Sequence, residues 1–115
     1  MSEVYKHAYV IGKTLPKRER FGLWSKIEDG LLSCLSLSIE AAFGKPEEKV
    51  RPLRELRVRL DVVKRLIRLA QELGVIDEKK YFRLQEHVVE SSKMAAGWMG
   101  YVERKEPARK RDSFS

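Results

Sequence analysis

Apolar residues recur every three or four positions through most of the chain, and no stretch shows a sustained alternation of apolar and polar positions. The first spacing is typical of amphipathic helices, and the second would indicate strands. Pro16, Gly44 to Pro46, and Gly74 interrupt the helical pattern. The pattern predicts helices at 2–15, 19–43, 47–73 and 77–102. Because the loops between them are short, we expect an all-α, antiparallel up-down-up-down four-helix bundle.

The predicted helix 19–43 is apolar over about two-thirds of its circumference when residues are placed at about 100° intervals. A surface helix in a monomer needs a narrower apolar stripe. Helix 19–43 is therefore either the central helix of the bundle or has a second face buried against another subunit. We interpret it as evidence for oligomerisation, with Phe21, Trp24 and Glu28 as interface candidates. Glu28 lies among apolar neighbours, and we expect it to pair with an arginine of another helix or subunit.

Composition narrows the class of protein. A chain of 115 residues forms one domain, here predicted as a bundle over 1–103 followed by a tail over 104–115. One cysteine, Cys34, allows neither an intrachain disulfide nor a multi-thiolate metal site, which favours a reducing, cytoplasmic location. The N-terminus lacks the apolar region of a signal peptide, and no stretch reaches the about eighteen apolar residues of a membrane span. Export and membrane insertion are not expected.

Charge points to a polyanionic partner. There are 24 Lys and Arg residues against 17 Asp and Glu, a net charge of +7, and residues 44–74 hold the largest share of the excess. Five cations of the predicted helix 47–73 fall within an arc of about 100° and form a stripe about 20 Å long, which could follow a phosphate backbone. They are Arg54, Arg57, Lys64, Arg65 and Arg68. The alternative is a solvated face partly paired with Asp61 and Glu72 at i,i+4 spacing. The tail 104–115 is also basic and is predicted to be disordered.

No motif indicates catalysis. The chain contains no phosphate-binding loop, no dinucleotide fingerprint and no HExxH pair. His87 lies near Glu86 and Glu90, a grouping that is more typical of a solvated helix surface than of a metal site. Cys34 falls on the apolar arc of its helix, which predicts a buried, inert thiol. We therefore expect no enzyme activity, no metal and no cofactor.

Two stretches resemble a known superfamily. The segment LPKRERFGL at 15–23, followed by an apolar helix to residue 42, resembles the signature of four-helix-bundle proteins encoded in intervening sequences of bacterial 23S rRNA genes. Within that superfamily, residues 68–74, Tyr81 and residues 90–98 are similar to the branch of Avd, the accessory variability determinant of diversity-generating retroelements. That branch ends in a Gly-Arg/Lys-hydrophobic-Leu-Gly-Gly-Trp motif. Lys93, Gly97 and Trp98 agree with it, whereas Ser92, Ala95 and Ala96 depart from it.

The resemblance implies a basic, homopentameric, ring-like (barrel) assembly that binds a reverse transcriptase and template RNA without a catalytic centre. An RNA/DNA hybrid or DNA is a further candidate ligand. Lys64 and Arg68 match basic positions of the Avd pattern on the third helix, and Lys93 matches the basic residue of the motif. Trp98 is expected at a helix or subunit contact rather than stacked on a base. The alternative is an intervening-sequence-type protein that acts as a structural, protein-interaction module.

Overall fold

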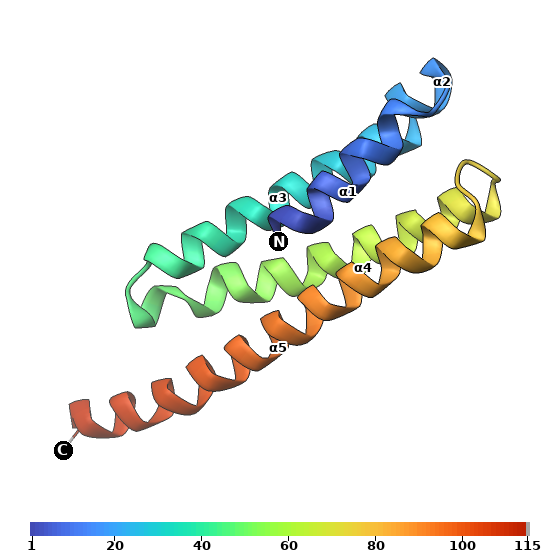
Figure 1. Ribbon diagram of the computed structural model, residues 1–115. Helices are drawn as coiled ribbons and strands as arrows, with labels where there is room; N and C mark the ends of the chain where they lie inside the picture. The colour runs from blue at the N-terminus through green and yellow to red at the C-terminus, as the bar shows by residue number, and fades with distance from the viewer. Residues whose placement is uncertain (115) are drawn as a thin grey trace.

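The computed structural model describes the backbone of residues 1–114 and the side chains of residues 1–104. This part of the chain contains helices and no strand. They are α1 (Ser2–Lys13), α2 (Lys17–Phe21), α3 (Leu23–Phe43), the short 3-10 helix η1 (Pro46–Glu48), α4 (Val50–Glu72) and α5 (Glu78–Phe114). Helices α3, α4 and α5 lie side by side along an elongated molecule, and α1 packs over one end of them (Figure 1). The expectation of an all-helical protein is confirmed.

The core forms where the apolar stripes of α1, α3, α4 and α5 meet. Six apolar residues, spaced three and four positions apart, form a seam along α4, and each of them is buried: Leu53, Leu56, Leu60, Val63, Ile67 and Ala70. They face Ile27 and Leu31 from α3 and Leu84 from α5, which are also buried. A fully buried Leu or Ile side chain contributes about 1.5–3 kcal/mol to folding. The three-and-four spacing of the sequence therefore accounts directly for the packing.

The helix predicted over 19–43 is two helices, because the chain turns at Gly22 between α2 and α3. The backbone of Gly22 has φ −96° and ψ −119°. A Cβ atom at this position would lie 2.7 Å from the carbonyl oxygen of Arg18, closer than real Cβ contacts allow. The prediction of one continuous helix was wrong for this reason: only glycine fits the turn.

Replacing Gly22 with alanine tests this turn. We expect Gly22→Ala to lower the free energy of unfolding by about 1–3 kcal/mol, because the backbone must shift to accept the methyl group. Gly97→Ala is the control, since a Cβ there meets no atom within 4 Å. That change should raise stability by up to about 1 kcal/mol, since alanine favours helix. Urea unfolding followed by circular dichroism measures both, and a Gly22→Ala variant as stable as the wild type would contradict the assignment.

The turn between α4 and α5 is stabilised by a helix cap on each side. Gly74 has φ +76°, the left-handed conformation that favours glycine after a helix. Its N–H donates to the carbonyl of Gln71 (3.0 Å), and the N–H of Val75 donates to the carbonyl of Ala70 (2.8 Å). Asp77 then caps α5, because its Oδ1 accepts a hydrogen bond from the N–H of Lys80 (2.8 Å). These interactions fix α5 antiparallel to α4.

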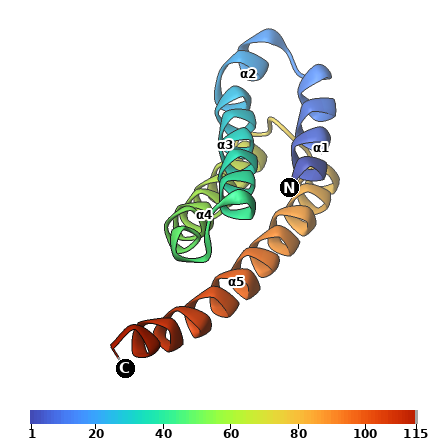
Figure 2. The same cartoon turned by 90° about the vertical axis from the view of Figure 1, so that its left-hand side faces the viewer.

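The helices have unequal lengths. At 1.5 Å per residue, the 12 residues of α1 span about 18 Å, whereas the 23 residues of α4 span about 35 Å. Helix α1 therefore covers only one half of the bundle, as Figure 2 shows. At the other end, α5 passes the predicted limit of residue 102 and continues to Phe114, so that boundary was wrong. The side chains of the predicted tail from residue 105 lie outside the described residues, and its disorder stays a prediction.

Candidate nucleic-acid interface

A groove of about 650 Å³ runs between α4 and α5. Four cations border it, three from α4 and one from α5. Its lining residues are Arg54, Arg57, Val58, Asp61 and Lys64 on α4, and Val89, Ser92, Lys93 and Ala96 on α5. The groove thus brings together four of the six residues that the sequence nominated for nucleic-acid binding.

Helical spacing explains how these cations share one groove. On α4, Arg57 follows Arg54 by three residues and Lys64 follows it by ten. This spacing places all three cations on one face of the helix, beside its buried seam. On α5, Ser92 and Ala96 are one turn apart, and their short side chains leave room between the helices. Lys93 follows Ser92 and borders the groove from the opposite side. The two helices therefore place positive charge along both edges of a channel with small side chains between them.

The remaining two nominated cations behave differently. Arg65 Nε lies 3.2 Å from Asp61 Oδ2, and Arg68 Nε lies 3.2 Å from Glu72 Oε1. Both pairs are exposed, and such pairs stabilise a protein by no more than about 1 kcal/mol. Neither Arg65 nor Arg68 lines the groove. For Arg65 and Arg68, the structure therefore matches the alternative of a solvated, ion-paired helix face.

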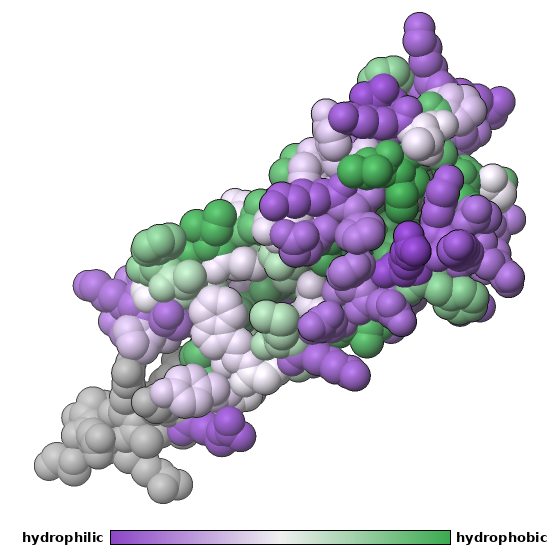
Figure 3. Space-filling view, in the orientation of Figure 1, coloured by the Kyte–Doolittle hydropathy of each residue, from purple (hydrophilic) through white to green (hydrophobic). Residues whose placement is uncertain are grey.

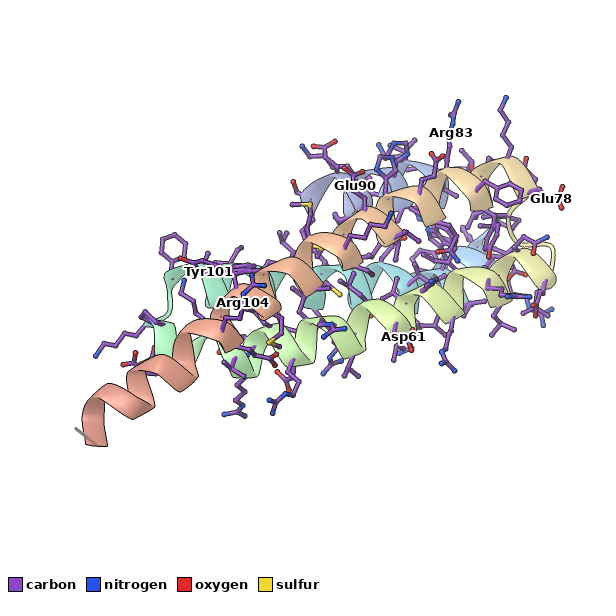
Figure 4. The ribbon with its side chains drawn as sticks, turned by 90° about the horizontal axis from the view of Figure 1, so that it is seen from below. Asp61, Glu78, Arg83, Glu90, Tyr101 and Arg104 are labelled. Atoms are coloured by element: carbon purple, nitrogen blue, oxygen red, sulfur yellow. The ribbon has the colours of Figure 1, made fainter. Side chains whose placement is uncertain are left out.

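No ion pair neutralises Arg54, Arg57, Lys64 or Lys93 among the described side chains. Asp61 is the acidic residue of the groove, and its carboxylate already contacts Arg65. Figure 4 shows Asp61 projecting from α4, with Arg83 and Glu90 on the far side of α5. The groove therefore offers positive charge that no carboxylate among the described side chains neutralises.

Gln85 also contributes to the contact between α4 and α5, and it was not among the residues predicted from the sequence. Its Nε2 donates to the backbone carbonyl of Lys64 (3.3 Å) and lies 3.2 Å from the hydroxyl oxygen of Tyr81. This hydrogen bond joins α5 to α4 next to a groove cation. A polar residue facing the apolar seam of α4 was the signal that could have indicated it.

The interface candidates separate into buried and exposed residues. Trp24 has no exposed surface, and its Nε1 donates to the carbonyl of Ala8 in α1 (2.9 Å). The prediction that Trp24 contacts another subunit was wrong, because the ring is enclosed within its own protomer. Phe21 is 71% exposed. Trp98 is half-buried, with Lys49 Nζ 5.7 Å from the centre of its ring.

Glu28 is half-buried beside Gly12 of α1. Within the described side chains it forms no ion pair with an arginine, so the expected pairing is not made inside the protomer. Burial raises the pKa of its carboxyl; Arg20 opposes that shift and Asp29 adds to it. The charged form of Glu28 is therefore disfavoured in the folded state.

This pKa shift predicts how stability responds to pH. A carboxyl whose pKa is higher in the folded state favours folding when protonated, below about pH 4, and loses that contribution as the pH rises through the folded pKa. We expect Glu28→Gln to raise the melting temperature relative to wild type at pH 7 and to lose that advantage at pH 4. Thermal unfolding of both proteins at the two pH values measures this. A lower melting temperature for Glu28→Gln at pH 7 would indicate instead that a cation stabilises the charged carboxylate.

The other reactive side chains are the single cysteine and the two histidines. Cys34 is fully buried, and burial raises the pKa of its thiol to about 11, so it is not a thiolate at neutral pH. His7 of α1 and His87 of α5 lie with their ring centres 4.5 Å apart and their planes tilted by 34°, a contact between helices that their positions in the sequence did not reveal. Among the described residues, no cluster of three or more His, Cys, Asp or Glu side chains is placed to hold a metal ion. Nor does any described helix have the length and apolar character needed to cross a membrane.

The fold and the groove define a helical-bundle protein with a basic channel between its two longest helices. The bAvd-like family model matches residues 1–102, so the chain belongs to the bAvd-like family. No curated protein and no solved structure matches it significantly. The matched range covers every residue that lines the groove.

Proposed function

We propose that this protein is a non-catalytic accessory protein of a diversity-generating retroelement, which binds template RNA and the reverse transcriptase to support mutagenic cDNA synthesis. Family membership supports the accessory role. The observation that carries RNA binding is the α4/α5 groove, where Arg54, Arg57, Lys64 and Lys93 have no acidic partner among the described side chains. Phosphates supply the negative charge that these cations lack.

The proposal includes a homo-oligomeric ring, with five subunits as the expected number. Helix α3 supports it, because the apolar arc remains wide after the core is formed: Leu32, Ile39 and Phe43 are 43%, 50% and 88% exposed. Helix α4 has a second exposed apolar stripe. Its members are Val58, Val62 and Leu69, and Leu73 extends it just beyond the end of the helix. A neighbouring subunit would remove these side chains from water, and a ring would place several basic grooves on one assembly.

Light scattering on the purified protein, alone and mixed with the reverse transcriptase and template RNA, tests this function. Five chains of 13.4 kDa give about 67 kDa for the free protein. The mixture should yield one complex that contains all three components, and the accessory protein alone should show no nucleotide incorporation. A monomer would contradict the ring. If the oligomer bound neither RNA nor the reverse transcriptase, the alternative of a structural, protein-interaction module would be favoured instead.

A further inference from the structure

The fourth corner of the bundle is filled over only half its length. Helix α1 begins at Ser2, beside the middle of α3, and no described segment continues along its axis between α3 and α5 (Figure 1). At this position lies an apolar groove of about 500 Å³, which we call the open corner. Its lining residues are Met1, Ser38, Leu56, Ser91, Lys93, Met94, Ala95, Gly97 and Trp98. In Figure 3, green and pale surface occupies this region between α3 and α5.

The open corner has the shape that a helix would fill. It continues the space that α1 occupies at the other end, with α3 on one side, α5 on the other and the core residue Leu56 of α4 at its base. Nearer the start of α5, one side of this helix packs on α1. Met94 and Trp98 lie further along the same side, yet Met94 is 67% exposed and Trp98 is half-buried. An apolar helical stripe on the partner would complete the packing that α1 provides elsewhere.

Gly97 gives independent support for close approach at this point. It lies within α5, where glycine weakens a helix, yet a Cβ there would meet no atom of the described residues within 4 Å. No contact inside the described protomer therefore requires glycine at a residue that lines the open corner. A second backbone packed against α5 would require it.

The charges around the open corner select an acidic partner. Lys49 lies over the ring of Trp98 at 5.7 Å and its Nζ is 3.4 Å from the carbonyl oxygen of Ala42, while Lys93 lines the corner itself. At the end of the open corner nearest α1, this helix begins without a side-chain cap, so its first N–H groups add positive charge. A second copy of this chain fits poorly, because the exposed apolar stripe of α4 is flanked by arginines and α2 has the basic sequence KRERF.

We propose that the open corner binds an amphipathic, acidic helix of the reverse transcriptase, laid end to end with α1. This inference depends on the proposed partnership with the reverse transcriptase and locates the contact surface. It is separate from the RNA-binding groove, although Lys93 borders both.

Affinity for the purified reverse transcriptase, measured by biolayer interferometry, tests the proposal. Met94→Glu places a carboxylate in the open corner, and we expect a loss of at least about tenfold. Gly97→Leu fills the corner without adding charge and should cause a similar loss. Phe82→Glu is the matched control, since Phe82 is 61% exposed on the same helix but outside the corner, and its affinity should stay within about twofold of wild type.

Circular dichroism and light scattering of each variant separate the outcomes. Loss of reverse transcriptase binding in Met94→Glu and Gly97→Leu, with helicity, oligomer mass and RNA affinity retained, is the expected result. Wild-type affinity in both variants would overturn the proposal while leaving the accessory function intact. A drop in oligomer mass would overturn it in favour of a second copy in the open corner. No binding of the reverse transcriptase by the wild type would contradict the proposed function itself.

Discussion

Arg57→Glu/Lys64→Glu should lower the affinity for structured RNA by at least about 100-fold at physiological salt. Both residues border the α4/α5 groove without an acidic partner among the described side chains. Each reversal removes one attraction to phosphate and adds one repulsion. Two lost phosphate contacts should also lower the slope of log affinity against log salt concentration by about two. Fluorescence anisotropy with a labelled RNA hairpin at several salt concentrations measures both quantities.

The matched control is Arg65→Glu/Arg68→Glu, which changes the net charge by the same amount on the same helix. These arginines are already paired with Asp61 and Glu72 and lie outside the groove lining. We expect a loss of less than about tenfold, from the long-range field alone. Equal losses in the two double variants would show that total charge, and not the groove, determines RNA binding. Circular dichroism and light scattering establish that both variants keep their fold and mass.

Trp24→Ala should have the largest effect on stability, lowering the free energy of unfolding by about 3–5 kcal/mol. Its ring is wholly enclosed between α3 and α1, so removing it leaves a cavity and also deletes the hydrogen bond from Nε1 to the Ala8 carbonyl. Helix α1 makes fewer contacts with the bundle than α3 or α4 does, so it should detach first. Hydrogen exchange should then show lost protection in α1 before α4.

Trp24→Phe separates the two contributions of the ring. It keeps most of the buried apolar volume and loses the hydrogen bond, and we expect a cost of about 1–2 kcal/mol. Urea unfolding gives both free energies. If Trp24→Ala unfolded at the wild-type midpoint while the light-scattering mass fell, Trp24 would be a subunit contact after all, and its position in the core would be contradicted.

Periodicity was enough to predict the helices and the buried seam, because one apolar face per helix is a local property of the sequence. Gly74 was also predicted to interrupt the helical pattern, since the chemistry of a helix end involves residues only a few positions apart. The break at Gly22 was not, because it depends on the distance from a Cβ to the Arg18 carbonyl, which is a property of the folded backbone.

The candidate site shows the same division. Helical spacing predicted the basic stripe on α4, but it did not predict which of these cations line the groove. Arg57 and Lys64 face α5, whereas Arg65 and Arg68 pair with carboxylates one turn away. A helical wheel gives directions around one helix and does not locate the neighbouring helix, so the groove required the packing of α4 against α5. Trp24 was misassigned for a related reason, since apolar residues of a core and of a subunit interface have the same composition.

The salt dependence of RNA binding by the wild-type protein tests the central claim most directly. Titration of a labelled RNA hairpin at a series of salt concentrations should give an affinity that falls linearly on a log–log plot. Four groove cations predict a slope of magnitude about three per protomer site, at roughly 0.7–0.9 for each phosphate contact. An affinity that does not change with salt, or no binding at low salt, would contradict the proposal that the groove between α4 and α5 binds a phosphate backbone.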